Sequence, residues 1–547
     1  MSLIAEELAK SQREISISEF FVKNKHLLGF DNPRKALLTT IKEAVDNSID
    51  ASEEAKILPD VRVEVTQLSE DRFMVIVEDN GPGIVKEQIP RIFGKLLYGS
   101  KFHRLKVSRG QQGIGISASA MYGQLTTGKP IKIISKIGKN KPAHYFEIHL
   151  DTKKNEPEIV SERIVDYNQD HGTRIEIELQ AKYQKGRQSI DEYLEQTAIV
   201  NPHLSLIYKS PENETREFPR ATNQLPKESR EIKPHPHGIE LGILIKMLRE
   251  TKAKTLQSFL ETEFCRVSSK VAHEICQTAG LYEKSHPSRI AREEADALYK
   301  SINQTKIMSP PTDSVIPLGE NLILKGLKKE IQADFYAAVT RPVAVYRGNP
   351  FIIEVGLAYG NNIPKDEPVR LLRFANRVPL LYQQSACATT SSVIKTKWAN
   401  YGLSQSRGAL PIGPLVLLIE ITSVWVPFTS ESKEAIAPYP EIIREIKLAL
   451  QDAGRELGSF IRKNVRAKEQ KEKVDLFEKY IPELASSLSS LSNEKKSEIE
   501  ENLQKILKKG LKDLLVENGI ENNAENKIIK ENKPIKQEKQ KTLDELE

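Results

Sequence analysis

The stretch KEAVDNSIDA, residues 42–51, lies in the segment that decides the first domain. From residue 33 to residue 51 apolar residues recur at helical spacing, which predicts an amphipathic helix. Its polar residues stand at positions i, i+3, i+4 and i+7, namely Glu43, Asp46, Asn47 and Asp50. This spacing predicts that the four side chains share one face and converge there. On its own, such a pattern is more often a solvated face than a site.

A tight turn follows the next two predicted strands. VRVEVTQL (61–68) and RFMVIVED (72–79) have the composition of strands, and the second is apolar enough to be central in a sheet. Asp79 ends that strand and begins DNGPGI, in which Gly81 and Gly83 allow the backbone to approach a ligand closely. Taken alone, the segment is also an ordinary β-turn.

A second glycine cluster lies in SRGQQGIGISASAMYG, residues 108–123. Its glycines directly precede a run of small residues that predicts a helix start, and this arrangement suits a backbone cradle for phosphates. It is neither a Walker A loop nor a Rossmann fingerprint, because no GK[ST] follows and GQQGIG departs from GxGxxG. A fourth element is HGTRIEI (171–177), where Thr173 follows a glycine at the entry to a strand.

Composition limits the function classes. A chain of 547 residues predicts three or four domains. Its 81 basic and 75 acidic residues leave a net charge of +6, so any nucleic-acid binding must come from local patches. Three widely spaced cysteines provide neither a disulfide framework nor a four-ligand zinc site. With no apolar leader or membrane-length stretch, we expect a cytoplasmic protein without membrane contact.

The rest of the chain divides by pattern. Further strand-like runs lie at residues 132–137, 145–151 and 173–179. Together with the helices, they predict that the first 225 or so residues form an α/β sandwich with helices over one sheet face. Residues 234 to about 301 are helical in pattern, and strand signals return between residues 342 and 426. A long helix is predicted from residue 439 to about 467. The charged tail contains two possible helices, at 474–488 and 499–515, before a polar end that we expect to be disordered.

The four motifs taken together resemble the GHKL (Bergerat) ATPase family. ExxxN on a helix, DxGxG after a strand, GxxGxG before a helix and GT before a strand occur in that order within about 130 residues, which chance explains poorly. Within this family the chain resembles the archaeal-type B subunits of topoisomerase VI over about residues 1 to 470. The resemblance rests on KLLYGSKFHRLKVSRGQQGIGISA, on the helical insertion after HPHGIELG, and on RFANRVPLLY with VWVPFTSESKEAIA.

The resemblance implies an α+β multidomain fold. Residues 1–228 would form a GHKL α/β sandwich with an N-terminal strap, and residues 229–306 a helix-two-turn-helix insertion. Residues 307–470 would form a second α/β domain, the transducer, ending in a long helix. Residues 471–547 would form a charged helical or disordered tail, to which the resemblance assigns no role.

The resemblance also implies residue roles in binding ATP and Mg²⁺. Glu43 would be the general base, Asn47 would bind Mg²⁺ through its amide oxygen, and Asp79, supported by Thr173, would accept a hydrogen bond from the adenine amino group. Lys433 would reach the γ-phosphate from the transducer, so that domain position follows nucleotide state. The remaining contacts would be Gly81, Gly83, Ser100, Lys101, Gly110, Gln111, Gln112, Gly113, Ile114, Gly115, Ile116 and Ser117.

The implied function is that of a DNA gate. ATP would dimerise two copies, each strapped over its neighbour by residues 1 to about 25, and close a gate on double-stranded DNA. An A subunit in an A2B2 heterotetramer would cut a second duplex, giving relaxation and decatenation near the nucleoid. Local basic residues of the helical insertion would contact DNA: Lys252, Lys254, Arg266 and Lys270. For any one of these residues, a solvated helix face is an equally good explanation.

Two alternatives stay open at this point. Another GHKL clamp, similar to mismatch-repair or chaperone ATPases, would lack a DNA-cutting partner. An ATP-insensitive scaffold is disfavoured, because Glu43, Asn47 and Asp79 are all present.

Overall fold

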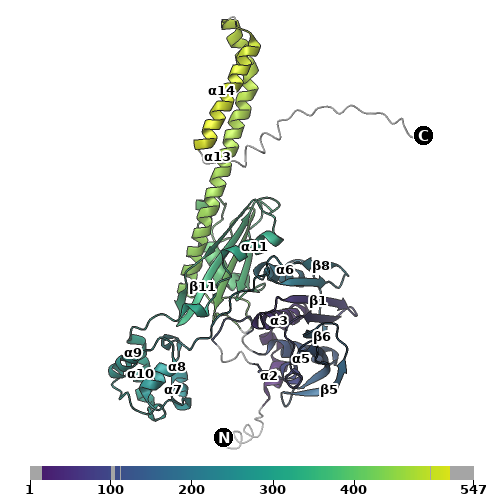
Figure 1. The fold of residues 1–547 in the computed structure, drawn as a ribbon, viewed down its shortest axis with the longest axis vertical. Helices are drawn as coiled ribbons and strands as arrows, with labels where there is room; N and C mark the ends of the chain where they lie inside the picture. Colours follow the sequence, from purple (N-terminus) through teal and green to yellow (C-terminus); the bar gives the residue numbers. More distant parts are fainter. Residues whose placement is uncertain (1–14, 100–104, 111–112, 431, 493, 518–547) are drawn as a thin grey trace, which may run out of the picture. The chain divides into compact units, whose positions relative to one another are not determined.

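The computed structural model describes residues 15–99, 105–110, 113–430, 432–492 and 494–517. The chain forms two compact units, residues 1–458 and 459–547 (Figure 1). In the part of the chain that the structure describes, no helix combines the length and apolar character needed to cross a membrane.

The first sheet has eight strands in the order β5-β4-β3-β6-β2-β1-β7-β8, and all neighbours are antiparallel except β1 and β7. The strands are β1 (Asp60–Gln67), β2 (Arg72–Asp79), β3 (Ile131–Lys136), β4 (Ala143–Asp151), β5 (Glu156–Val165), β6 (Gly172–Gln180), β7 (Ser205–Lys209) and β8 (Thr215–Phe218). As expected, β2 is a central strand, and every second residue along it is buried. The register pairs Asp79 with Thr173, so two of the sequence motifs meet at one end of the sheet.

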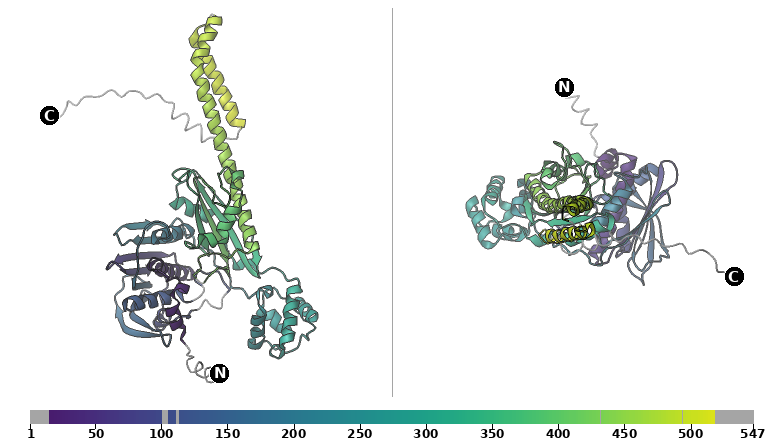
Figure 2. Two further views of the ribbon diagram at one scale, coloured as in Figure 1. Left: turned by 180° about the vertical axis from the view of Figure 1, so that it is seen from behind. Right: turned by 90° about the horizontal axis from the view of Figure 1, so that it is seen from above.

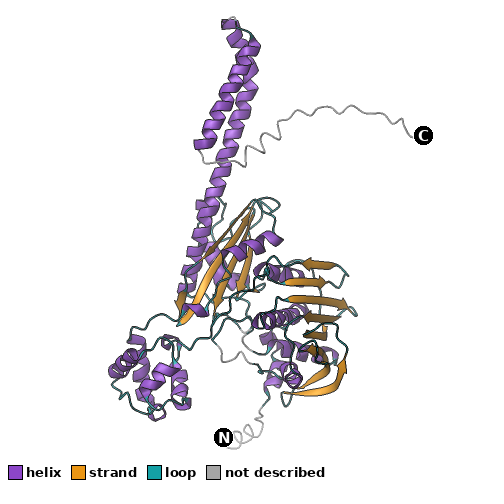
Figure 3. Ribbon diagram, in the orientation of Figure 1, coloured by secondary structure: helices purple, strands orange, loops and turns teal. Residues whose placement is uncertain are grey.

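Helices cover one face of this sheet. They are α2 (Ile17–Lys23), α3 (Pro33–Glu54), α4 (Ile89–Gly94), α5 (Gly115–Thr127) and α6 (Ile190–Val200). The predicted helix is α3, which begins where the Asn32 side chain accepts a hydrogen bond from the Lys35 amide and Pro33 occupies the first turn. α3 and α5 pack on β2 and β6, as Figure 3 shows. The predicted α/β sandwich is therefore confirmed.

The predicted helical insertion is also present. It consists of α7 (Leu241–Glu250), α8 (Leu256–Glu263), α9 (Ser269–Ala279) and α10 (Arg292–Gln304), with no strand among the described residues between α7 and α10. The four helices enclose their own apolar core, which includes Leu244, Phe259, Ile275 and Leu298.

The second sheet consists of β9 (Phe335–Thr340), β10 (Ala344–Tyr346), β11 (Asn349–Tyr359), β12 (Arg370–Ala375), β13 (Val378–Pro379) and β14 (Leu415–Ser423). Strand order is β10-β11-β14-β12-β13, with β9 beside β11. β14 is buried along its whole length, which explains its continuous apolar run. α11 (Glu320–Glu330) packs on this sheet and on α6, where Gly326 approaches the Ile199 carbonyl too closely for a side chain. The two sheet domains therefore share a core.

The C-terminal helices differ from the prediction. Instead of separate helices before and after residue 470, a single helix, α13, runs over Pro440–Ser492 and is followed by α14 (Lys496–Glu517). The intervening run AKEQKEK is strongly charged, but its residues are good helix formers, so it does not end the helix. α14 lies beside the C-terminal part of α13 (Figures 1 and 2), where Ile481, Ala485 and Ile499 are buried. The end expected to be disordered lies outside the described residues.

Candidate functional site

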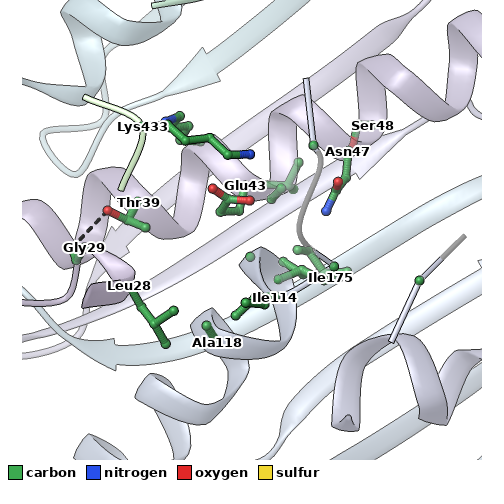
Figure 4. Close-up of a pocket in the computed structure, with 18 of the residues that line it drawn as sticks. Leu28, Gly29, Thr39, Glu43, Asn47, Ser48, Ile114, Ala118, Ile175 and Lys433 are labelled. Atoms are coloured by element: carbon green, nitrogen blue, oxygen red, sulfur yellow. Dashed lines mark hydrogen bonds between the residues drawn. The ribbon is translucent and has the colours of Figure 1, made fainter. Parts of the chain in front are cut away.

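A cavity of about 680 Å³ lies inside the first unit. Its walls come from α3, the turn after β2, the start of α5 and two segments of the second sheet domain, residues 379–382 and 432–434. Figure 4 shows Glu43, Asn47 and Lys433 at this cavity. The structure thus brings together motifs that are far apart in the sequence.

Of the four α3 residues predicted to converge, two face the cavity. Glu43 and Asn47 line it, and neither side chain hydrogen-bonds to another residue in the described part of the chain. Asp46 instead accepts a hydrogen bond from the Tyr193 hydroxyl at 2.9 Å, and burial raises the pKa of Asp46 to about 7. Asp50 pairs with Arg109 at 2.7 Å. The predicted convergence of all four is wrong. Asp46 and Asn47 are adjacent along the helix and so point about 100° apart. Asp50 lies two turns from Glu43, where it pairs with Arg109.

Asp79 is buried and holds a defined set of partners. Its Oδ1 accepts hydrogen bonds from the Gly81 amide at 2.9 Å and the Thr173 amide at 3.2 Å, and its Oδ2 accepts one from the Ser48 hydroxyl at 2.8 Å. Burial raises the pKa of Asp79, and these hydrogen bonds oppose that rise. The Thr173 hydroxyl hydrogen-bonds with Ser135 at 3.0 Å. Asp79 and Thr173 both line the cavity, so a preorganised acceptor stands there.

The DNGPGI turn needs its glycines. Gly83 has φ of +71°, and a side chain there would collide with the Lys136 carbonyl. At Gly81, a Cβ atom would lie 2.9 Å from Asp79 Oδ1. Gly83 lines the cavity, whereas Gly81 contributes the amide that holds Asp79. The turn therefore brings backbone to the cavity wall, as the sequence predicted.

The second glycine cluster surrounds the N-terminus of α5. Its cavity-lining residues are Gly110, Gly113, Ile114, Gly115 and Ile116. Because the first amides of a helix have no partner within the helix, they point a partial positive charge into the cavity. The Ser117 hydroxyl donates instead to the Ile114 carbonyl at 3.0 Å, so only its backbone is available. The expected contacts Ser100, Lys101, Gln111 and Gln112 lie outside the described residues.

Gly115 also controls the position of Glu43. A side chain at Gly115 would overlap the Glu43 carboxylate, so the start of α5 lies directly against that carboxylate. Contact of this kind holds the carboxylate in one place beside the helix N-terminus.

Lys433 reaches the cavity from the second sheet domain, with φ of +53°. Burial lowers the pKa of Lys433, and the carboxylates of Glu43 and other acidic residues on α3 counteract part of that effect. Its neighbour Glu434 pairs with Lys35 of α3 at 2.5 Å and accepts a hydrogen bond from Gln383 at 2.8 Å. The pair with Lys35 holds the Lys433 loop against the first domain, and the Gln383 contact fastens it within the second.

Sequence reasoning missed several cavity residues. Leu28 and Lys35 enter from the start of the chain, and Leu380, Leu381 and Tyr382 enter from the second sheet domain. The last three lie in RFANRVPLLY, which was singled out only through resemblance. Nothing local in that apolar run indicates a ligand, so only its placement reveals the role.

No cluster of three or more His, Cys, Asp or Glu side chains that could hold a metal occurs among the described residues. Mg²⁺ takes oxygen ligands from substrate phosphates and water, so it does not require such a cluster. The exposed side chain of Asn47, which lines the cavity, fits this mode of binding.

Two known families match the chain. Residues 32–183 match the family described as histidine kinase-, DNA gyrase B- and HSP90-like ATPases, and residues 310–473 match the transducer of the topoisomerase VI B subunit. The fold and the cavity therefore define a GHKL-class ATPase carrying a transducer domain.

Comparison with similar proteins shows to which family within this class the chain belongs. The B subunit of type 2 DNA topoisomerase 6 from Methanococcoides burtonii is 53% identical over 487 residues, covering 89% of this chain and 78% of that protein. The protein of the same name from Archaeoglobus fulgidus is 47% identical over 494 residues, covering 90% and 82%. The chain belongs to the family of topoisomerase VI B subunits. Among solved structures, the B-subunit of DNA gyrase from Myxococcus xanthus aligns over 81% of this chain and 95% of that chain, at 12% identity and a TM-score of 0.40.

Proposed function

We propose that this chain binds and hydrolyses ATP as the B subunit of a type IIB DNA topoisomerase. The observation that carries the proposal is the shared cavity, in which Lys433 of the transducer lies beside Glu43 and Asn47 of the ATPase domain. A cavity built from both domains can convert nucleotide state into domain position.

The proposed residue roles are those that the family resemblance implies, and the cavity geometry supports several of them. Glu43 would take a proton from the water that attacks the γ-phosphate, since its carboxylate lines the cavity beside the first turn of α5. Asp79, supported by Thr173, would accept a hydrogen bond from the adenine amino group. The turn at Gly81 and Gly83 would let the adenine ring approach the backbone. The loop from Gly110 to Ser117 would hold the phosphates with backbone amides. Ser100, Lys101, Gln111 and Gln112 belong to the same proposal.

Asn47 would hold Mg²⁺ through its amide oxygen, and the ion when bound would neutralise part of the triphosphate charge. Lys433 would bind the γ-phosphate as a compact positive charge. Once that phosphate leaves, the lysine loses its partner and the transducer is free to move relative to the nucleotide.

The proposed partners are DNA, a second copy and an A subunit. ATP-driven dimerisation would use the first 25 or so residues as a strap, with α2 as its described part. The gate would act on double-stranded DNA while the A subunit of an A2B2 heterotetramer cuts a second duplex. We place the assembly in the cytoplasm of an archaeal-type cell, at the nucleoid. The four-part domain division at residues 228, 306 and 470 is part of this proposal.

Activity on DNA topology tests the function. The chain is mixed with an A-subunit candidate and supercoiled DNA, and ATP-dependent relaxation and decatenation are compared for the wild type and Glu43→Ala. The wild type should be active and the variant inactive. ATP-driven dimerisation without topological activity would favour another GHKL clamp, and absence of nucleotide binding would reject the ATPase altogether.

We expect Asp79→Asn to weaken ATP binding by about ten- to a hundredfold, because a charged acceptor with three fixed partners loses its geometry and charge. Calorimetric titration with a non-hydrolysable ATP analogue measures the loss. The matched control is Glu78→Gln on the same strand, whose side chain pairs with Arg174. Equal affinities for the two variants would contradict the role of Asp79.

Duplex binding is expected to be strongly salt-sensitive. Lys252, Lys254, Arg266 and Lys270 are exposed, and none forms an ion pair with another described residue. If each neutralises one phosphate, log affinity should fall with log salt with a slope on the order of −3 to −4. Replacing all four with glutamine should flatten this slope, which fluorescence anisotropy would measure. Wild-type affinity that does not change between low and high salt would exclude this contact.

A further inference from the structure

A buried ionic cluster lies behind the phosphate loop, centred on Glu53 in the last turn of α3. Glu53 Oε1 accepts hydrogen bonds from Arg109 at 2.7 Å and from the His203 ring at 2.9 Å. Arg109, with 1% of its side chain exposed, also pairs with Asp50 at 2.7 Å. We call Asp50, Glu53, Arg109, His203 and Arg377 the Glu53 cluster. Arg109 is adjacent to Gly110, so the cluster reaches the first residue of the phosphate loop.

Arg377 completes this cluster from the transducer. Its two terminal nitrogens donate to Glu53 Oε1 at 3.0 Å and Oε2 at 2.9 Å, a bidentate pair between the domains. Burial by itself would raise the pKa of Glu53, but the two guanidinium groups outweigh it and hold the pKa well below its usual range. Burial lowers the pKa of His203. With that ring neutral, two carboxylates balance two guanidinium groups.

The turn that carries Arg377 is strained. Asn376 and Arg377, at φ of +50° and +64°, form a two-residue hairpin between β12 and β13, in which Ala375 pairs with Val378. Such turns favour Asn-Gly, because glycine adopts a positive φ without cost. The buried side chain of Glu420 stabilises the turn, because its Oε1 accepts a hydrogen bond from the Arg377 backbone amide at 2.8 Å. The position is thus suited to glycine, yet it holds an arginine, whose side chain makes the bidentate contact with Glu53.

The same turn also contacts the chain just before the phosphate loop. Asn376 Nδ2 donates to the Ser108 carbonyl at 3.1 Å, next to Arg109. The hairpin therefore contacts the residues that lead into Gly110 in two ways: directly, from the Asn376 side chain to the Ser108 carbonyl, and indirectly, from Arg377 through Glu53 to Arg109. Arg377 itself does not line the cavity.

We propose that Arg377 is a positioning residue for nucleotide binding, which acts through Glu53 to fix Arg109 and hence the start of the phosphate loop. This inference rests on the proposed ATPase function and adds a second coupling between the transducer and the nucleotide. The two couplings differ in kind. Lys433 would respond to the γ-phosphate, whereas Arg377 would set the loop for ADP and ATP alike.

Nucleotide affinities of the full chain test the proposal. Dissociation constants for ADP and for a non-hydrolysable ATP analogue are measured by calorimetry for the wild type and Arg377→Gln. We expect both affinities to fall about tenfold, as is typical when a coupling contact is removed. The matched control is Arg370→Gln, because Arg370 lies on the neighbouring strand β12 and pairs with Glu195 of α6 across the same interface at 2.9 Å. Its affinities should stay within about twofold of the wild type.

A double-mutant cycle separates positioning from general destabilisation. In a Glu53→Gln background, Arg377→Gln should cause little further loss, because the contact through which it acts is already broken. Arg377→Lys keeps the charge without the bidentate geometry and should bind with intermediate affinity. If Arg377→Gln melts below the assay temperature, Arg377→Lys provides the same comparison with a smaller expected loss.

Three results would overturn the proposal. Unchanged affinities in Arg377→Gln would show that the loop does not depend on the contact. A loss confined to the ATP analogue would place the effect at the γ-phosphate, and a full loss in the Glu53→Gln background would show that Arg377 does not act through Glu53. Absence of nucleotide binding by the wild type would refute the ATPase function itself, and the positioning role with it.

Discussion

Glu43→Gln is expected to lower kcat for ATP hydrolysis by about 10²- to 10⁴-fold, the usual contribution of a general base. Glutamine keeps the size and the position against Gly115 but cannot accept a proton from water. Nucleotide affinity should change little, because the contacts of Asp79 with adenine and of the phosphate loop with the phosphates remain. This separation of binding from hydrolysis is what distinguishes a base from a structural carboxylate.

The measurement is phosphate release at saturating ATP, combined with the affinity for a non-hydrolysable analogue. Glu54→Gln is the matched control, since Glu54 lies on the same helix but is exposed and away from the cavity. It should hydrolyse ATP at the wild-type rate. If the Glu43→Gln variant kept more than about a tenth of the wild-type kcat, Glu43 would not be the general base.

Lys433→Gln is expected to lower kcat about 10²- to 10³-fold, as for the loss of one preorganised charge at a transition state. Lys433 lies in the same cavity as Glu43, and its loop is fixed to α3 by the pair of Glu434 with Lys35. Since its proposed partner is the γ-phosphate, the affinity for ADP should stay unchanged while that for an ATP analogue falls.

Paired titrations with ADP and the analogue test this selectivity. Lys395→Gln serves as the control, because Lys395 is an exposed lysine of the same domain at the end of α12 (Ala388–Lys395). Equal weakening of ADP and analogue binding in Lys433→Gln would mean that the lysine supports the cavity as a whole and does not sense the γ-phosphate.

Elements with a strong periodic pattern were predictable. The helix expected over residues 33–51 is α3, and the strands expected at 61–68 and 72–79 are β1 and β2. β5 was not predicted, because it is an edge strand with residues exposed on both faces and so lacks alternation. β7 and β8 are short strands at the opposite edge and carry a similarly weak signal. Burial on at least one face is what made a strand recognisable.

The side-chain directions on α3 show a second limit. Spacing along the helix correctly predicted that Glu43 and Asn47 lie on the same side of α3, since both line the cavity. It could not show that Asp46 turns to Tyr193 and Asp50 to Arg109, because those partners come from other parts of the chain. Side chains on one face of a helix can therefore point into two different environments, here the cavity and the buried contacts beside it.

By itself the sequence determined the local features: the α3 helix, the strand that ends at Asp79, and the glycine turns that bring backbone to the cavity wall. These depend on short-range propensity and periodicity, which a few adjacent residues express. Only the tertiary structure decided that Lys433 lies beside Glu43, about 390 residues away along the chain, and that Arg377 pairs with Glu53. Such contacts arise from the packing of two domains on a shared core, and no local pattern in the sequence encodes that packing.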